Sequence, residues 1–248
     1  AVTPDSGLAE FDKTLTSDQL ANNLGMGYAL SNTLESYYER ERTNQGLQVE
    51  TLWGNPYTTE EMIDSYVKKG FKSIRIPVTW HNHIRDFDYT IDPKWMKRIK
   101  TVVDWAIQKK LYVILNLHHD IARYNEDGIG YGTGIYPLRK DMEESERFIY
   151  NVWRQIAITF NTGYDHHLIF EAINEPRLRG LDYEYNCPKG AEICEEAVEV
   201  INEYNRLALK AVRSTGVNNE KRFMLFQPIS GSVDILMDYE FVFPDDID

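Results

Sequence analysis

The sequence is short of positive charge, and it has no long hydrophobic run. Its 248 residues include 27 lysines and arginines against 39 aspartates and glutamates, which gives a formal net charge of −12. A surface of this sign argues against nucleic-acid partners and against binding to anionic membranes, and it suits a neutral substrate better than a polyanion. No apolar stretch approaches the length of a membrane span, so we expect no membrane partner.

Cysteine is nearly absent as well. The two cysteines, Cys187 and Cys194, lie seven positions apart in a polar segment. This spacing favours a local disulfide that pins a loop, and the alternative is two free thiols in a cytosolic protein. Two cysteines without a nearby histidine pair make a poor zinc site. We expect a secreted, extracellular protein, which requires that a signal peptide has already been removed, because none is evident.

Apolar runs that suit buried strands alternate with helix-length segments along the chain. Connections of that length imply parallel strands, right-handed crossovers and an α/β fold. No linker, low-complexity run or repeat divides the chain, so we expect residues 1–248 to belong to one domain. The expected strands are 25–30, 71–78, 111–117, 168–173 and 222–227, and the expected helices are 17–24, 58–70, one that begins at 92–93, 141–160, 191–215 and 233–239.

The strand expected at 168–173 ends in a polar pair, Asn174 and Glu175, followed by Pro176. Proline removes a backbone donor and pushes Glu175 toward an extended conformation, so the strand stops there. A carboxylate and a carboxamide are then fixed at the carboxyl end of a buried strand, which is the end that carries chemistry in parallel α/β folds. The alternative is a strand end that is polar by chance.

Two earlier strands also end in polar side chains. Arg75 belongs to the second strand, and His118 and His119 follow the third. The alternative for Arg75 is a structural ion pair with Glu171, which lies four positions before Glu175 and should share its strand face, and this pairing is compatible with a functional role. One of the two histidines has a simpler interpretation as a hydrogen-bonded core residue. Together the three strand ends predict a site able to bind a proton or a sugar hydroxyl.

Five motifs in register carry a family resemblance. They are Gly27-Tyr28 with 31–35, Trp53-Gly54-Asn55-Pro56, Arg75-Ile76-Pro77-Val78, Asn116-Leu117-His118-His119 and Asn174-Glu175-Pro176. From about residue 24 to the end, the chain resembles glycoside hydrolase family 5, the endo-β-1,4-glucanases and their relatives. The Trp-Gly-Asn-Pro motif and the double histidine resemble the branch that contains cellulases, lichenases and xyloglucan-active enzymes. The resemblance implies a (β/α)8 TIM barrel that hydrolyses β-1,4-glucosidic bonds in cellulose or related β-glucans, with retention, through two glutamates.

The resemblance also implies roles for individual residues. Glu175 matches the general acid/base, and Asn174 matches the asparagine that binds the sugar 2-hydroxyl. Arg75 matches the arginine that keeps the nucleophilic carboxylate ionised, and His118 matches the family's site histidine. Further candidates for sugar contacts are His119, Asn32, Trp53 and Trp80. The alternative for the tryptophans is ordinary core packing.

The sequence departs from the family at the nucleophile. The family has this glutamate at the end of strand seven, but only five strands are recognisable here, and the chain stops at 243–248. Glu171 is a poor substitute because it lies deeper in the barrel. A sheet of five parallel strands would expose two edges and part of its core, so we expect a second polypeptide with strands six to eight, about 90–130 residues in a barrel of ordinary size.

Two other classes of function remain open. The first is a carbohydrate-binding fragment or remnant that keeps Glu175 but has no turnover. The second is a metal-dependent hydrolase using His118, His119 and Glu175, which is disfavoured because adjacent histidines on an extended segment should point apart. We therefore expect no metal and no cofactor, and a cello-oligosaccharide or β-glucan as substrate.

Overall fold

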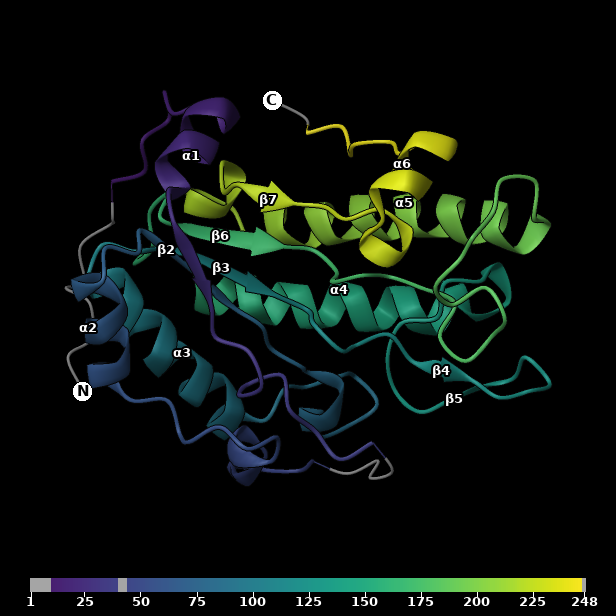
Figure 1. Cartoon of the computed structure of the whole chain (residues 1–248), viewed down its shortest axis with the longest axis horizontal. Helices are drawn as coiled ribbons and strands as arrows, with labels where there is room; N and C mark the ends of the chain where they lie inside the picture. Colours follow the sequence, from purple (N-terminus) through teal and green to yellow (C-terminus); the bar gives the residue numbers. More distant parts are fainter. Residues whose placement is uncertain (1–9, 40–43, 247–248) are drawn as a thin grey trace.

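The computed structural model describes residues 10–39 and 44–246, and it contains a parallel sheet of five strands. Residues 1–9, 40–43 and 247–248 of the expected single domain lie outside these ranges. The strands follow one another in the order β1-β2-β3-β6-β7 (Figure 1). The bounds are β1 Gly27–Ala29, β2 Ser73–Ile76, β3 Tyr112–Asn116, β6 Leu168–Glu171 and β7 Met224–Leu225. All five expected strands are therefore confirmed, each shorter than its apolar run.

Helices connect the strands, and several begin where the sequence predicts. Thr59 caps α2 by accepting a hydrogen bond from the Met62 amide, and Asp92 caps α3 with Pro93 in the first turn. Every expected helix is present in the structure. The bounds are α1 Ser17–Leu24, α2 Glu60–Lys68, α3 Pro93–Gln108, α4 Met142–Thr159, α5 Glu192–Arg213 and α6 Val233–Asp238.

Shorter elements were not predicted. A two-stranded antiparallel hairpin, β4 Arg123–Tyr124 with β5 Gly130–Tyr131, lies between β3 and α4. Strands of two residues are too short to show a hydrophobic period. Short 3-10 helices are also present, at Leu47–Thr51, His81–His83, Arg139–Asp141, Val217–Glu220 and Ile229–Gly231.

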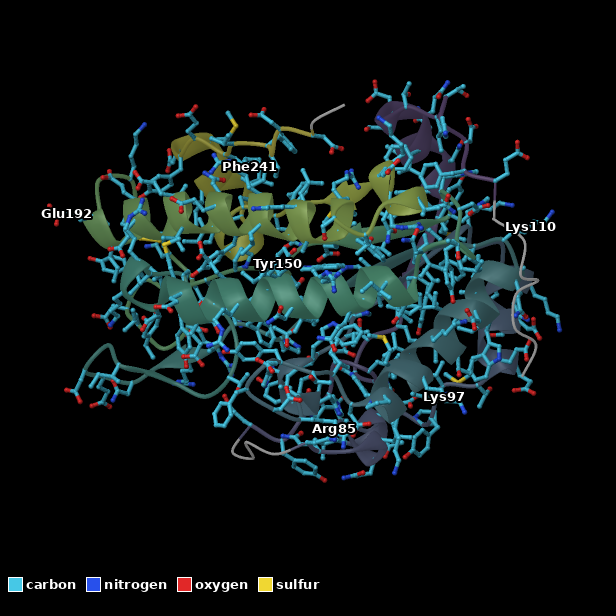
Figure 2. The ribbon with its side chains drawn as sticks, turned by 180° about the vertical axis from the view of Figure 1, so that it is seen from behind. Arg85, Lys97, Lys110, Tyr150, Glu192 and Phe241 are labelled. Atoms are coloured by element: carbon cyan, nitrogen blue, oxygen red, sulfur yellow. A yellow bond between two sulfur atoms is a disulfide. The ribbon has the colours of Figure 1, made fainter. Side chains whose placement is uncertain are left out.

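The core lies between one face of the sheet and the helices that pack on that face. Figure 2 shows α4 and α5 side by side across that face. Every residue of β6 is buried, as an apolar strand covered on both faces should be. Trp153 of α4 is fully buried, and its indole nitrogen donates to the Ala172 carbonyl at 3.0 Å, which ties the helix to the end of β6.

The strand register brings the carboxyl ends together. Ala29 of β1 pairs with Arg75 of β2, and Asn116 of β3 pairs with Glu171 of β6, which in turn pairs with Leu225 of β7. In Figure 1 the arrowheads of β3, β6 and β7 point toward the side on which the β4–β5 hairpin lies. None of the helices in the described residues is long and apolar enough to cross a membrane.

Candidate active site

Glu171 is the centre of a buried polar cluster at the ends of the strands. Its carboxylate accepts from Arg75 Nε at 2.7 Å and from Arg75 Nη2 at 2.6 Å, so the ion pair given as the alternative for Arg75 is present, and it is bidentate. Asn116 Nδ2 at 3.1 Å and Gln227 Nε2 at 2.7 Å donate to the same carboxylate. Three strands and the segment that follows β7 thus contribute to one network, in which Glu171 is only 3% exposed. Its oxygens are occupied by these donors, which suits a positioning role better than nucleophilic attack.

Asn174 and Glu175 lie at the mouth of this cluster. Arg75 Nη2 also donates to Asn174 Oδ1 at 2.7 Å, and the Asn174 amide donates to the Leu117 carbonyl. The Glu175 amide donates to Gln227 Oε1 at 2.9 Å, while its side chain is 52% exposed. The backbone of Glu175 has a φ of 42°, so the expected extended conformation is wrong. Side chains with Cβ disfavour this left-handed region, and the Gln227 contact helps to hold it.

His118 is a neutral imidazole beside the cluster. Burial, together with the positive charges of Arg75 and Arg177, lowers the pKa of His118 to about 2. Asn116 Nδ2 lies 3.0 Å from His118 Nδ1. Because an amide nitrogen donates, Nδ1 is the acceptor and the proton of the neutral ring is on Nε2. His118 can therefore donate a hydrogen bond to a substrate from Nε2.

An aromatic group surrounds His119. Its ring lies 5.5 Å from the Trp53 ring and 5.9 Å from the Tyr37 ring, between centroids. Trp53 is 40% exposed, so one face of this group is accessible. The rings of His118 and His119 meet edge-on at 4.5 Å, so the expectation that they point apart is wrong. Burial lowers the pKa of His119 to about 4, which keeps this ring neutral as well.

Trp80 does not belong to the accessible site. Its side chain is completely buried, with its indole nitrogen donating to the Asn116 carbonyl at 2.9 Å. Its backbone amide donates to a carboxylate oxygen of Asp120, also at 2.9 Å. The prediction of a sugar contact for Trp80 is wrong, because no face of the ring is open to a ligand. Packing under the strand ends explains this tryptophan.

Asn32 lies on the exposed turn that follows β1. It has a φ of 61°, and its amide donates to the carboxylate of Glu35, which is buried at 2% exposure. Burial raises the pKa of Glu35 above its ordinary value, although hydrogen bonds from the Thr33 and Asn32 amides oppose this. The turn is therefore fixed from beneath, with the Asn32 side chain left on the surface.

Several members of the site were missed in the sequence. Asn116 belongs to one of the sequence motifs, but the motif gives it no role, and the sequence patterns do not single out Gln227, Tyr37 or Arg177. Gln227 is the last residue of the strand expected at 222–227, and Asn174 directly follows the strand expected at 168–173; a polar residue at such a position is the signal that would have identified Gln227. Tyr37 and Arg177 stand in loops, and no periodic pattern marks them.

The expected disulfide is present between Cys187 and Cys194, which are both buried. It closes a turn in the segment that leads from β6 to α5. Since α5 begins at Glu192, the bond fixes this loop to the first turn of that helix.

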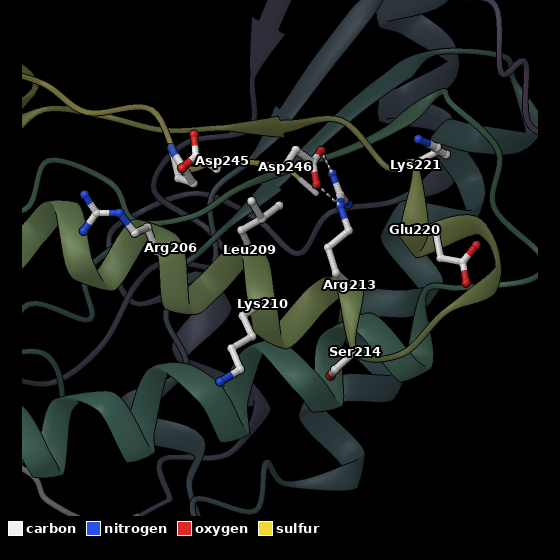
Figure 3. A pocket seen from close by; sticks show the side chains of 10 residues that line it. Arg206, Leu209, Lys210, Arg213, Ser214, Glu220, Lys221, Asp245 and Asp246 are labelled. Carbon is white, nitrogen blue, oxygen red and sulfur yellow. Dashed lines mark hydrogen bonds and ion pairs between the residues drawn. The ribbon is translucent and has the colours of Figure 1, made fainter. Parts of the chain in front are cut away.

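Two other features lie away from the strand ends. A cavity of about 580 Å³ opens along the second half of α5, where Arg213 pairs with Asp246 at 2.7 Å (Figure 3). Residues 165–167, at the start of β6, offer one carboxylate and two imidazoles within 4.8 Å of one another. Neither feature shares a residue with the polar cluster around Glu171.

The geometry defines a class of protein, one with a parallel α/β sheet and a carboxylate–arginine site at the strand ends. A profile of the family described as Cellulase (glycosyl hydrolase family 5) matches residues 37–228. The chain belongs to glycoside hydrolase family 5. It is 36% identical to Endoglucanase A of Clostridium longisporum, over 93% of this chain and 41% of that protein.

Solved structures agree with this assignment. A family 5 lichenase from Caldicellulosiruptor sp. F32, in complex with cellotetraose, superposes with a TM-score of 0.85 at 34% identity, over 97% of this chain and 61% of that one. A GH5-4 broad specificity endoglucanase from Ruminococcus champanellensis with bound cellotriose gives a TM-score of 0.81 at 35% identity, over 94% of this chain and 63% of that one.

These matches confirm the predicted fold class. The five parallel strands are the first five of a (β/α)8 TIM barrel. The chain spans about half the length of the curated relatives it matches. The comparisons give no support to the second polypeptide expected to carry strands six to eight.

Proposed function

We propose that this chain supplies the acid/base half of the active site of a retaining endo-β-1,4-glucanase. The observation that carries the proposal is the placement of Glu175 beside the Arg75–Glu171–Asn174 network at the carboxyl ends of the strands. The relatives named endoglucanase and lichenase support β-glucans as the substrate class.

Glu175 is the proposed general acid/base. Its half-exposed carboxylate can reach a substrate, whereas that of Glu171 is buried and occupied. It would protonate the glycosidic oxygen in the first step and deprotonate water in the second. Asn174, oriented by Arg75, would bind the sugar 2-hydroxyl, a contact that strengthens in the transition state.

The nucleophile is proposed to come from sequence that corresponds to strand seven of the family. Arg75 is 27% exposed, and its Nη1 has no hydrogen-bond acceptor within residues 10–39 and 44–246. It could therefore hold a further carboxylate in its ionised form. In a retaining enzyme that carboxylate should lie about 5 Å from Glu175.

Sugar units are proposed to bind along Trp53, His119, His118 and Asn32. The exposed indole of Trp53 can stack on the apolar C–H face of a sugar ring, and His118 can donate to a hydroxyl from Nε2.

We also propose that the protein is secreted, which the Cys187–Cys194 disulfide supports, because such bonds persist in oxidising surroundings. Recovery of activity only from a cell lysate, with two free thiols per chain, would contradict secretion.

Replacing Glu175 by glutamine in the full-length protein tests the function. We expect turnover of a cello-oligosaccharide to fall about 10²–10⁴-fold, as for loss of a general acid/base, with its binding affinity kept. Glu143→Gln, at an exposed position in the first turn of α4, is the matched control and should keep full turnover. A binding remnant would show affinity but no turnover before and after the substitution. Full turnover in Glu175→Gln would refute the assigned role.

A further inference from the structure

Arg177 connects the exposed carboxylate of Glu175 to a second, better buried one. Arg177 Nη1 lies 3.2 Å from Glu175 Oε2, and Arg177 Nε donates to Glu184 Oε1 at 3.1 Å. The Arg177 side chain is only 19% exposed, against 52% for Glu175. A planar guanidinium that binds two carboxylates through different nitrogens has its orientation fixed by the less mobile of the two.

Glu184 is that fixed partner. Its other oxygen accepts from the Gly180 amide at 2.8 Å, and its own carbonyl accepts from the Ser230 hydroxyl at 3.2 Å. Burial alone would raise the pKa of Glu184, but the hydrogen bonds from Gly180, Tyr185 and Arg177 hold that pKa below its ordinary value. The carboxylate is therefore ionised at neutral pH and holds Arg177 in place.

Tyr185 covers the outer side of this arginine. The guanidinium carbon of Arg177 lies 5.4 Å from the centroid of the Tyr185 ring, within the range of a cation–π contact. The ring itself is 77% exposed. The loop that carries these residues is closed at its far end by the disulfide between Cys187 and Cys194, which restricts its motion.

We propose that Arg177, anchored by Glu184, is a positioning residue that orients the Glu175 carboxylate for proton transfer to the leaving group. The inference rests on the acid/base role proposed for Glu175. In the first step the nucleophilic carboxylate proposed above forms a bond to the anomeric carbon as the C–O bond to the leaving sugar breaks; the leaving oxygen takes the proton from Glu175, which becomes a carboxylate. The positive charge of Arg177 stabilises the negative charge that develops on Glu175 as the proton leaves.

The test compares two substrates in the full-length protein by their kcat/KM. Cellotetraose has a poor leaving group and needs a proton from Glu175, whereas 2,4-dinitrophenyl β-cellobioside has a good leaving group and needs none. For Arg177→Ala we expect a loss of about tenfold or more on cellotetraose and less than about threefold on the aryl glycoside. Arg177→Lys keeps the charge and should recover part of the loss, and Glu184→Gln should show the same pattern more weakly.

A matched control is available in Arg139, which also pairs with two glutamates, Glu199 and Glu203, but on the outer side of α5. Arg139→Ala should change neither kcat/KM. Equal losses on both substrates in Arg177→Ala would show a general structural defect and overturn the positioning role, as would no loss on either. If the proposed acid/base role of Glu175 is itself wrong, Glu175→Gln would show no difference between the two substrates. That result is distinct from a failure of the Arg177→Ala prediction alone.

Discussion

Arg75 of β2 and Glu171 of β6 form a bidentate ion pair across the strand that separates them. The two contacts measure 2.7 and 2.6 Å, and the Glu171 side chain is 4% exposed. Residues 96 positions apart in the sequence are thereby joined at the base of the candidate site. The same arginine holds Asn174, so one interaction links the stability of the sheet to the geometry of the site.

Removing Arg75 should therefore destabilise the protein as well as inactivate it. Arg75→Ala leaves the buried Glu171 carboxylate without its cation, which costs about 3 kcal/mol in comparable buried pairs. The free energy of unfolding from urea titration measures the loss. The double variant Arg75→Ala/Glu171→Gln should recover part of it, because the unpaired charge is gone. A double variant as unstable as the sum of the single ones would contradict this coupling.

Stability should also decline in mild acid because of buried neutral histidines. His83 is fully buried and stacks on Trp95 at 3.7 Å between centroids. Burial lowers the pKa of His83 to about 3, although Asp92 opposes this. Between about pH 3 and pH 6.5 the histidine binds protons more readily in the unfolded chain than in the folded protein. The free energy of unfolding therefore falls as the pH drops, by up to about 1.4 kcal/mol per pH unit for each such group.

The variant His83→Phe checks this source of acid sensitivity. Its free energy of unfolding should fall less steeply between pH 6.5 and 4 than that of the unmodified protein. His118 and His119, whose pKa values are also lowered by burial, should account for much of the remaining slope. An identical slope in the variant would show that His83 is not held neutral in the folded state.

The two tryptophans of the sequence motifs should respond differently to substitution. Trp53→Ala removes an exposed ring, so we expect KM for a cello-oligosaccharide to rise about fivefold with the melting temperature nearly unchanged. Trp80→Phe removes a buried hydrogen bond and should lower the free energy of unfolding by about 1–3 kcal/mol. Steady-state kinetics and thermal melts of both variants measure this contrast. A stability loss in Trp53→Ala with unchanged KM would show instead that the Trp53 ring serves packing and not sugar binding.

Local signals predicted the elements well. The starts of α2 and α3 were predictable because capping, here by Thr59 and Asp92, depends on a few adjacent residues. The strands were predictable because each is marked by a run of consecutive apolar residues. The site was only partly predictable, because it depends on register between distant strands. Gln227 meets Glu171 only when β7 pairs with β6. Whether Trp53 or Trp80 is exposed is likewise decided by packing, which no short pattern encodes.

The central claim is that Glu175 is the acid/base of a retaining glucanase, and chemical rescue tests it most directly. In the full-length Glu175→Ala protein, azide added with 2,4-dinitrophenyl β-cellobioside should restore turnover, because the small anion needs no general base to attack the glycosyl-enzyme. The product should be β-cellobiosyl azide by proton NMR, since two inversions retain the configuration. An α-configured azide would assign Glu175 as the nucleophile, and the absence of any rescue would contradict the acid/base role.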